Sequence, residues 1–230
     1  MTDFRKSTVY QIYPRSFYDT NGDGFGDLKG VTAKLDYIKE LGVDYIWMTP
    51  FFVSPQYDNG YDVEDYYNID PRYGTMEDFE ELSREAQKRG IKLMLDMVFN
   101  HTSSNHEWFQ KALAGDERYK NYYIFKKGKE DGSAPTNWES KFGGSAWEYV
   151  PEMDEYYLHL FHVKQPDLNW DNPKVRKEVQ KVVRFWMSKG VKGFRFDVVN
   201  LISKDKFEDD FEGDGRRFYT DGPNIHQYLK

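Results

Sequence analysis

The sequence contains no cysteine among its 230 residues. This absence excludes disulfide bonds, thiolate-bound metals and cysteine nucleophiles together. No apolar run approaches the roughly 18 residues that a membrane-spanning helix needs. The first residues, Met1 to Lys6, also lack the apolar stretch of a secretory signal. We therefore expect a globular protein of the cytoplasm.

Clusters of positive charge are also missing. The formal net charge is −7, with 32 Lys and Arg against 39 Asp and Glu. Because nucleic-acid binding depends on grouped Lys and Arg that neutralise phosphates, we do not expect it. The five histidines show no metal-ligand spacing, and neither a glycine-rich phosphate loop nor a Ser-His-Asp arrangement is present. Neither a nucleic acid nor a membrane is expected as a partner.

Aromatic residues, in contrast, are abundant, at 18% of the chain. Flat aromatic faces suit a hydrophobic core, where they bury a large apolar surface. They equally suit sugar rings, whose C–H faces stack on them. Composition alone leaves both interpretations open, so the choice depends on where in the fold these residues lie.

Three segments share one pattern, in which an amphipathic helix ends at a glycine and a hydrophobic strand follows. The glycines and the strands after them are Gly42 with Val43–Met48, Gly90 with Ile91–Asp96, and Gly190 with Gly193–Val198. Glycine just past a helix is the expected left-handed cap. An earlier apolar run, Val9–Tyr13, supplies a first strand, and residues 223–230 indicate the start of another helix. Strands that alternate with helices predict parallel βα units.

The spacing of these glycines is uneven. Gly42 and Gly90 are 48 residues apart, whereas Gly90 and Gly190 are 100 apart. The extra residues lie between the third strand and its helix, and we predict that residues 102–172 form an irregular, β-rich inserted subdomain. Residues 1–101 and 173–230 then form the first half of a (β/α)8 barrel, a fold that typically takes about 250 residues. The predicted fold class is α/β, and the barrel is incomplete.

In βα barrels the functional residues gather at the C-terminal ends of the strands. Polar side chains at these ends are Asp96, Asn100 and His101 after the third strand, and Arg195 and Asp197 on the fourth. Arg195 and Asp197 are two residues apart and point to the same face of the strand. Beside a guanidinium, a carboxylate stays ionised and can act as a nucleophile or as a charge stabiliser. A buried structural ion pair is an equally good interpretation.

The loop Asp19–Asp27 alternates oxygen-bearing side chains with glycines, which suits a hard cation such as Ca²⁺ or Mg²⁺. It begins like an EF-hand, but its twelfth position is Gly30 rather than Glu, so an EF-hand is rejected. The predicted ligands are the side chains of Asp19, Asn21, Asp23 and Asp27 and the backbone carbonyl of Phe25. A turn without a metal is the alternative.

A second polar loop, Asp58–Asp62, follows the second strand and would reach the same end of the barrel. Asp58 and Tyr61 can bind sugar hydroxyls by hydrogen bonding and stacking. By itself, this segment is just as well a surface turn.

Taken together, these segments resemble glycoside hydrolase family 13, the α-amylase family. The matching segments keep their order and spacing over essentially the whole chain; they are Val9–Pro14, Asp19–Asp27, Asp58–Asp62, Asp96–His101, Gln165–Trp170 and Gly193–Asp197. The resemblance implies that Asp197 is the nucleophile of a retaining α-glucoside hydrolase and that Arg195 holds it in place. The residues that it implies for sugar binding are Asp58, Tyr61, His101, Phe142, Phe161 and Gln165. The Asp19–Asp27 loop would be the family's calcium or magnesium site.

Sequence features that differ among members of the family narrow the choice of substrate. Val198, directly after the implied nucleophile, resembles members that act on linkages other than α-1,4. The stretches Ala134–Trp147 and Gly213–Pro223 are most similar to members that hydrolyse trehalose 6-phosphate to glucose and glucose 6-phosphate. Members that hydrolyse α-1,6-linked oligosaccharides share most motifs but match these two stretches less well. This part of the resemblance implies a phosphorylated α-linked disaccharide as the small-molecule partner.

A substrate phosphate needs cationic side chains. Arginine offers a fork that fits phosphate, and lysine offers a point charge. The candidates are Lys141, Lys204, Arg216 and Arg217. For each of them, a solvated surface charge is the alternative.

The resemblance also implies a missing partner. Retaining cleavage needs two carboxyl groups about 5–5.5 Å apart, and in the family the acid is a glutamate on a later strand, beyond Lys230. We therefore expect the 230-residue chain alone to have little or no glycosidase activity. The alternative from another class is an inactive amylase-like fragment that only binds a cation. The presence of Asp197, Arg195 and His101 argues that the chain derives from an active enzyme.

Overall fold

The structure is a computed structural model that describes residues 4–204 and 206–209. The chain divides into two compact units. The first contains the residues up to Ser54, then Asp65–Met97 and Lys181–Phe196; the second contains Pro55–Glu64, Val98–Gln180 and the described residues from Asp197 onward. The predicted insert at residues 102–172 lies entirely in the second unit. Its exact limits, and those of the flanking segments 1–101 and 173–230, stay a prediction.

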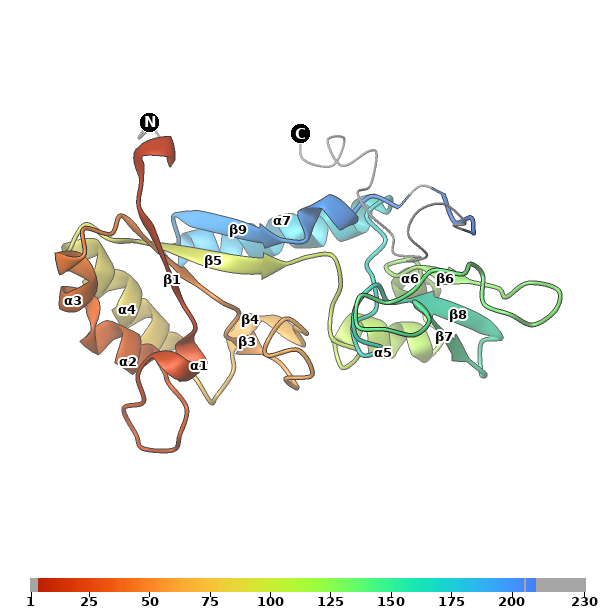
Figure 1. Ribbon diagram of the computed structural model, residues 1–230, viewed down its shortest axis with the longest axis horizontal. Helices are drawn as coiled ribbons and strands as arrows, with labels where there is room; N and C mark the ends of the chain where they lie inside the picture. Colours follow the sequence, from red (N-terminus) through yellow and green to blue (C-terminus); the bar gives the residue numbers. More distant parts are fainter. Residues whose placement is uncertain (1–3, 205, 210–230) are drawn as a thin grey trace. The chain divides into compact units, whose positions relative to one another are not determined.

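The first unit is built on a four-stranded sheet in the order β1-β2-β5-β9 (Figure 1). The strands are β1 Val9–Ile12, β2 Tyr45–Met48, β5 Lys92–Val98 and β9 Gly193–Asp197. β2 runs parallel to both β1 and β5, so that Met48 lies between Ile12 and Leu95. Each of the four strands falls where the sequence predicts one, and the parallel βα architecture is confirmed.

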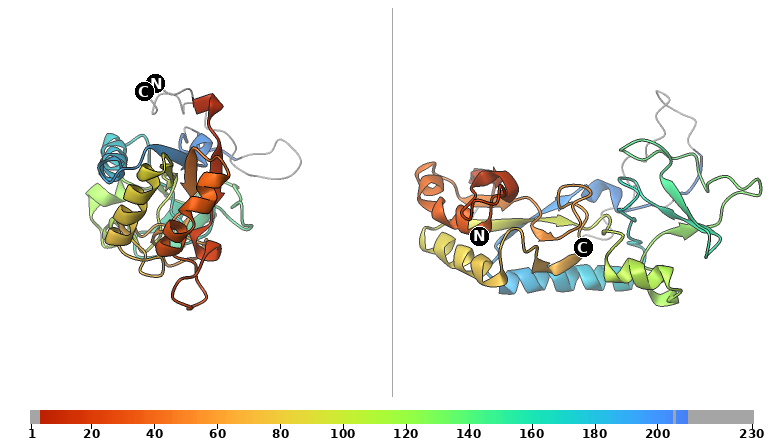
Figure 2. Two further views of the ribbon diagram at one scale, coloured as in Figure 1. Left: turned by 90° about the vertical axis from the view of Figure 1, so that its left-hand side faces the viewer. Right: turned by 90° about the horizontal axis from the view of Figure 1, so that it is seen from below.

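Helices lie alongside this sheet (Figure 2). They are α1 Pro14–Phe17, α2 Leu28–Ala33, α3 Leu35–Glu40, α4 Met76–Lys88 and α7 Pro173–Ser188, whose last turns from Lys181 belong to this unit. α4 begins with a capping box, in which Thr75 and Asp78 satisfy each other's backbone N–H groups. Gly90 follows its C-terminus at φ +72°, which makes it the predicted left-handed cap. The helix–glycine–strand pattern is therefore confirmed here.

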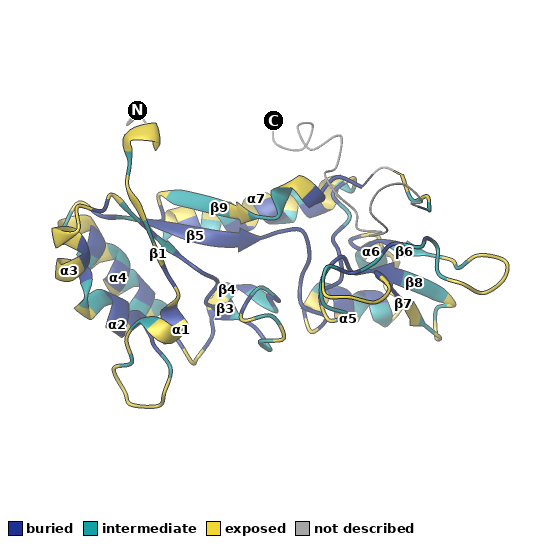
Figure 3. Cartoon of the chain, viewed as in Figure 1, coloured by how far each residue is buried: buried dark blue, intermediate teal, exposed yellow. Residues whose placement is uncertain are grey.

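The core of this unit combines the buried strand β5 with a cluster of aromatic rings. β5 is buried from Leu93 to Val98 (Figure 3), as expected for a central parallel strand. Trp186 on α7 is fully buried, and its ring contacts those of Phe51, Phe52 and Phe79 with centroids 5.0–6.1 Å apart. Its indole N–H donates to the carbonyl of Tyr66 at 2.8 Å. A large part of the aromatic content therefore serves packing.

Two local features differ from the sequence pattern. The apolar residues from Val31 to Leu41 follow one helical period, but the helix is divided at Lys34, which ends α2 and precedes α3 with φ −102° and ψ 8°. A two-stranded antiparallel ribbon, β3 Phe52–Val53 with β4 Asp65–Ile69, was not predicted. A strand of two residues is too short to produce a periodic signal.

The second unit carries a small antiparallel sheet in the order β6-β8-β7. Its strands are β6 Phe125–Lys126, β7 Trp147–Val150 and β8 Glu155–Leu158. The helices α5 Glu107–Leu113 and α6 Glu117–Lys120 precede the sheet, and short 3₁₀ turns occupy Phe4–Lys6 in the first unit and Val199–Leu201 in this one. Trp138, Trp147, Leu158 and Leu160 form a separate core. The insert is irregular and β-containing, as predicted, with two helices in its first part.

Two further findings concern helices. The helix predicted at residues 223–230 lies outside the described residues. Along the part of the chain that the structure describes, no helix combines the length and the apolar content needed to cross a bilayer.

Candidate active site

Arg195 on β9 forms an ion pair with Asp96 on β5. Its Nη1 donates to both carboxylate oxygens of Asp96, at 3.0 and 3.1 Å. The indole N–H of Trp47 on β2 donates to the same carboxylate at 3.1 Å, and the guanidinium carbon lies 5.1 Å from the Trp47 ring centroid. The Asp96 side chain is 0% exposed and that of Arg195 is 36% exposed. Three neighbouring strands are thus tied together by one charged cluster.

Four of the residues expected to bind sugar come together in the second unit. Gln165, which is fully buried, donates from Nε2 to Asp58 Oδ2 at 2.9 Å and to the carbonyl of Tyr61 at 3.1 Å. His101 Nε2 lies 3.1 Å from the same carbonyl and 3.2 Å from Gln165 Nε2. The segments around residues 58, 101 and 165 are far apart in sequence, so this convergence is a property of the fold.

The two predicted aromatic residues lie beside this cluster. The Phe161 ring centroid is 5.2 Å from that of His101 and 5.9 Å from that of Phe142. Phe142 is 57% exposed, which leaves an aromatic face open to solvent or to a ligand. Ser140 holds the two backbones together, because its hydroxyl donates to the Phe161 carbonyl and accepts from the Phe142 N–H. A hydrogen-bonding floor and an exposed aromatic wall are the features that a sugar ring requires.

Asp197, the last residue of β9, acts electrostatically on this cluster. Burial raises the pKa of Asp58, the hydrogen bond from Gln165 opposes the rise, and the charges of Asp62 and Asp197 add to it. Burial lowers the pKa of His101, against the opposing negative charges of Asp167, Asp197 and Asp58. Asp197 is therefore close enough to influence two of the predicted sugar-binding residues.

Backbone strain follows Asp197 directly. Val198 has φ +40° and ψ 36°, in the left-handed region. A β-branched residue is rare there, and such strain costs on the order of 1–3 kcal/mol. Strain of this kind clusters at functional sites, where the surrounding structure enforces it. Val198, which the family resemblance connects with linkage preference, thus also has an unusual backbone conformation.

Asp62 is a positioning residue that the sequence motif alone does not identify. It is 0% exposed, and its carboxylate accepts the backbone N–H groups of Tyr57 at 2.8 Å and Asp58 at 3.0 Å. These bonds hold the loop that carries Asp58. The sequence signal was present, since Asp62 closes the Asp58–Asp62 motif, but sequence spacing does not show which aspartate faces inward.

Lys204 is buried rather than exposed. Its side chain is 1% exposed, so the alternative of a solvated surface charge is wrong for this residue. Its ammonium contacts three oxygens, which are those of Leu201 (carbonyl, 2.6 Å), Asn100 (Oδ1, 2.8 Å) and Asp167 (Oδ2, 3.1 Å). A lysine ammonium has three N–H donors, so none remains for a substrate phosphate in this arrangement.

The other three phosphate candidates are less defined. Lys141 is half-buried and directly precedes Phe142 in the sequence. Its backbone N–H donates to the carbonyl of Leu160 at 2.8 Å, so its backbone also lies near Phe161. Arg216 and Arg217 lie outside the described residues. Lys141 therefore stays the best-placed phosphate candidate among the described residues.

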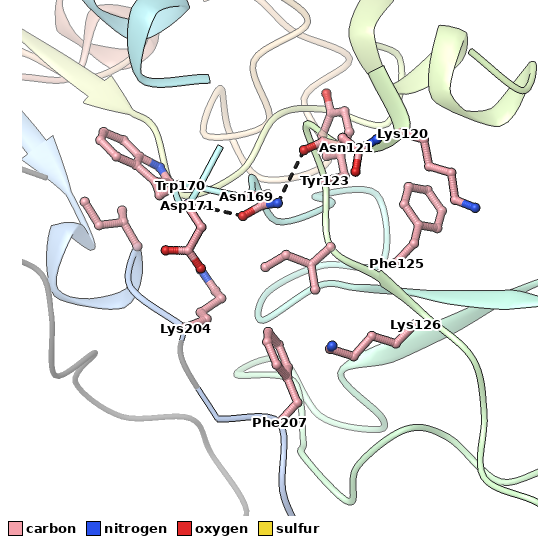
Figure 4. A pocket seen from close by; sticks show the side chains of 12 residues that line it. Lys120, Asn121, Tyr123, Phe125, Lys126, Asn169, Trp170, Asp171, Lys204 and Phe207 are labelled. Atoms are coloured by element: carbon pink, nitrogen blue, oxygen red, sulfur yellow. Dashed lines mark hydrogen bonds between the residues drawn. The ribbon is translucent and has the colours of Figure 1, made fainter. Parts of the chain in front are cut away.

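A cavity of about 300 Å³ lies in the second unit, and Figure 4 shows the side chains around it. Among the described residues predicted for sugar or phosphate binding, only Lys204 lines it. The two other lysines at its edge are already engaged: Lys126 lies 4.2 Å from the Phe207 ring centroid, and Lys120 pairs with Glu155 at 2.7 Å. The cavity therefore shares only Lys204 with the residues predicted to bind sugar or phosphate, and it is not the predicted sugar site.

The Asp19–Asp27 loop folds on itself. Asp19 accepts backbone N–H groups from Asn21, Gly22 and Gly24 at 2.7–3.1 Å, and these bonds lower its pKa. Asp27 caps α2 through Gly30 and also accepts from Thr20. Within residues 4–204 and 206–209, no three acidic or histidine side chains converge as a metal site would require.

Comparison with known proteins gives one consistent result. Residues 11–230 match the catalytic domain of the alpha amylase family. The chain is 59% identical to trehalose-6-phosphate hydrolase of Bacillus subtilis over 228 residues, which are 98% of the chain and 41% of that protein. It is 53% identical to oligo-1,6-glucosidase of Parageobacillus thermoglucosidasius, covering 99% of the chain and 42% of that protein.

A solved structure agrees with these relatives. The crystal structure of Bacillus licheniformis trehalose-6-phosphate hydrolase superposes with a TM-score of 0.94 at 60% identity, covering 98% of the chain and 41% of that protein. The chain thus spans less than half the length of these relatives. Together with the sheet order, the superposition confirms the predicted fold class, the first half of a (β/α)8 barrel.

Proposed function

Because the chain belongs to the α-amylase family, as the match of residues 11–230 establishes, we propose that it supplies the nucleophile and a sugar-binding subsite of a retaining α-glucoside hydrolase. The substrate in this proposal is trehalose 6-phosphate, and the products are glucose and glucose 6-phosphate. The observation that carries the proposal is the convergence of Asp58, His101 and Gln165 within the electrostatic reach of Asp197.

In the proposed reaction, Asp197 attacks the anomeric carbon and forms a covalent glucosyl ester, which water then hydrolyses. Asp58 accepts hydrogen bonds from hydroxyl groups of the sugar, Gln165 and His101 line the site and hold Asp58 and the Tyr61 carbonyl in place, and Phe161 with Phe142 contacts the ring. Arg195 keeps the end of β9 fixed through Asp96. The leaving oxygen needs a general acid, which the family provides from a later strand. The chain alone is therefore expected to be inactive, and the cytoplasmic location stays a prediction.

The main alternative is an oligo-1,6-glucosidase, since such an enzyme is 53% identical to the chain. Two chimeras separate the alternatives. In one, the chain replaces the matching 41% of the Bacillus subtilis trehalose-6-phosphate hydrolase; in the other, it replaces the matching 42% of the Parageobacillus oligo-1,6-glucosidase. Each chimera and its parent are assayed on trehalose 6-phosphate, isomaltose and maltose.

The second chimera is the informative one, because its remaining part comes from an enzyme named for α-1,6 linkages. We expect its kcat/KM ratio for trehalose 6-phosphate over isomaltose to rise about tenfold or more above its parent, which corresponds to ~1.4 kcal/mol of differential transition-state binding. An unchanged ratio would favour the oligo-1,6-glucosidase. Two folded chimeras without any turnover would favour the inactive fragment.

The proposal includes a hard cation, Ca²⁺ or Mg²⁺, in the Asp19–Asp27 loop. The donor chemistry fits, because every predicted ligand there offers oxygen, from Asp19, Asn21, Asp23, Asp27 and the Phe25 carbonyl. In the structure these side-chain oxygens accept hydrogen bonds from N–H groups of the loop and of α2, and each carboxylate oxygen has a second lone pair that a cation can use. The cation would stabilise the turn between β1 and α2 and would take no part in bond cleavage.

We expect the melting temperature of the chain to rise with added Ca²⁺ or Mg²⁺, because a ligand that binds only the folded state stabilises it. Asp23→Asn should remove most of this rise, since it deletes a charge from the predicted ligand set. Asp131→Asn is the matched control, because Asp131 also holds an exposed turn, through Ser133. The cation site would be contradicted if neither cation raised the melting temperature of the unmodified chain. It would also be contradicted if the melting temperature of Asp23→Asn rose as much as that of the unmodified chain.

A further inference from the structure

Behind His101, a buried chain of hydrogen bonds ends on Lys204. Lys204 donates to Asn100 Oδ1 at 2.8 Å and pairs with Asp167 at 3.1 Å. Asn100 Nδ2 in turn donates to Asp167 Oδ2 at 3.2 Å and lies 3.0 Å from His101 Nδ1. All four residues are buried, with exposures of 0–4%. The arrangement isolates one face of His101 from solvent.

The partners of Asn100 determine how its amide is oriented. The Lys204 ammonium can only donate hydrogen bonds, so the Asn100 atom that faces it is the oxygen. The Asp167 carboxylate, paired with Lys204, can only accept, so the Asn100 atom that faces it is the nitrogen. Reversing the amide would place two donors against each other on one side and two acceptors on the other.

The orientation of Asn100 then determines the tautomer of His101. Asn100 Nδ2 has two N–H groups: one serves Asp167 and the other points at His101 Nδ1. Nδ1 must therefore accept, and the ring proton must be on Nε2. This agrees with the other side of the ring, where Nε2 lies 3.1 Å from the Tyr61 carbonyl, which is an acceptor. The two N–H groups of Gln165 are already directed to Asp58 and to the same carbonyl.

We propose that Lys204 is a positioning residue which, through Asn100 and Asp167, keeps His101 neutral with its proton on Nε2. The Nε2–H then donates to the Tyr61 carbonyl and holds the loop that carries Asp58 beside the sugar site, with no need for the imidazole to select a tautomer when substrate binds. The sugar site beside this loop rests on the proposed function, whereas the tautomer itself does not. Lys204 acts from behind His101 and needs no contact with the substrate.

Charge balance supports the same role. The charged groups that act on His101 are Asp58, Asp167 and Asp197, and all three favour the protonated ring. Burial acts in the opposite direction and lowers the pKa of His101 below its ordinary 6.5. Lys204 neutralises Asp167, so its removal would leave that carboxylate to raise the pKa of His101. Burial lowers the pKa of Lys204 as well, against the opposing effect of Asp167, so burying this pair carries a desolvation cost.

Nitrogen-15 NMR of the histidine side chains of the 230-residue chain tests this directly. His101→Gln identifies the His101 signals among those of the five histidines. We expect Nδ1 to resonate as an unprotonated nitrogen and Nε2 as a protonated one, and we expect the ring to titrate below pH 6.5. A protonated Nδ1 in the neutral ring of the unmodified chain would overturn the proposal.

Two variants test the part played by Lys204. Lys204→Met should raise the pKa of His101, whereas the Asp167 carboxylate still faces the Asn100 nitrogen, so the neutral ring should keep its proton on Nε2. The double variant Lys204→Met with Asp167→Asn removes both charges, which avoids an unpaired buried carboxylate and protects the fold. It should give both tautomers, because the amide introduced at position 167 can either donate to Asn100 or accept from it. Lys192→Met, at an exposed lysine of the first unit, should change neither.

If the Nε2–H tautomer were as fully populated in the double variant as in the unmodified chain, Lys204 would not determine the tautomer of His101. The measurement needs no substrate, so a wrong substrate assignment leaves its outcome unchanged. Failure of the substrate assays and failure of this proposal are therefore distinguishable.

Discussion

Replacing Asp197 by Asn in the chimera with the Bacillus subtilis enzyme is expected to lower kcat/KM for trehalose 6-phosphate by about three orders of magnitude or more. The amide cannot attack the anomeric carbon, so the covalent step is lost while the shape of the site is kept. KM should change far less, because the proposed sugar contacts of Asp58, His101 and Gln165 remain. Steady-state kinetics of glucose 6-phosphate release measure both constants.

The matched control is Asp154→Asn, at an exposed turn between β7 and β8 where the backbone has φ +52° and tolerates Asn. Its kcat/KM should equal that of the unmodified chimera. If the Asp197 variant kept even a tenth of the activity, Asp197 could not be the nucleophile.

Replacing Arg195 by Met should destabilise the sheet around β5 and β9 by about 2–3 kcal/mol. Loss of one partner from a fully buried ion pair costs about 3–5 kcal/mol, but Arg195 is 36% exposed and water screens part of the effect. Asp96, at 0% exposure, would keep the Trp47 N–H but lose the bonds from the guanidinium. Hydrogen exchange of the β5 amides should accelerate by about 30- to 150-fold, the corresponding change in local opening.

A double-mutant cycle identifies the cause. Asp96→Asn keeps an acceptor for Trp47 and removes the charge, so that adding Arg195→Met to it should cost much less than in the unmodified chain. Arg195→Lys keeps a positive charge, so its stability should lie between that of the unmodified chain and that of Arg195→Met. Equal costs in both backgrounds would show that Arg195 stabilises the sheet through packing alone.

The fold was largely predictable because its signals are local. Gly42, Gly90 and Gly190 mark the helix ends, with φ between +72° and +98°, and each is followed by an apolar strand. The division of the helix at Lys34 was not predictable, because the apolar helical period continues through that residue. The strand β3 was not predictable, because it spans only two residues. Tertiary contacts, which no local pattern records, determine such details.

The candidate site was predictable in its membership but not in its pairings. The motif segments around Asp58, His101 and Gln165 were identified, and the structure brings them together. The partner of Arg195 in the structure, Asp96, lies 99 positions away in sequence, and spacing gives no sign of it. The burial of Lys204 was not predictable either, because a lysine among polar neighbours in the sequence is typical of a solvated surface charge.

Covalent trapping tests most directly whether this chain carries the nucleophile. A fluorinated α-glucosyl fluoride destabilises the positively charged transition state of ester hydrolysis, so the glucosyl ester accumulates; fluoride leaves without needing a strong general acid. After exposure of the chimera with the Bacillus subtilis enzyme to this reagent, mass spectrometry of its peptides should find one glucosyl adduct, on Asp197. An adduct on any other residue, or turnover of the reagent with no adduct at all, would contradict the assignment.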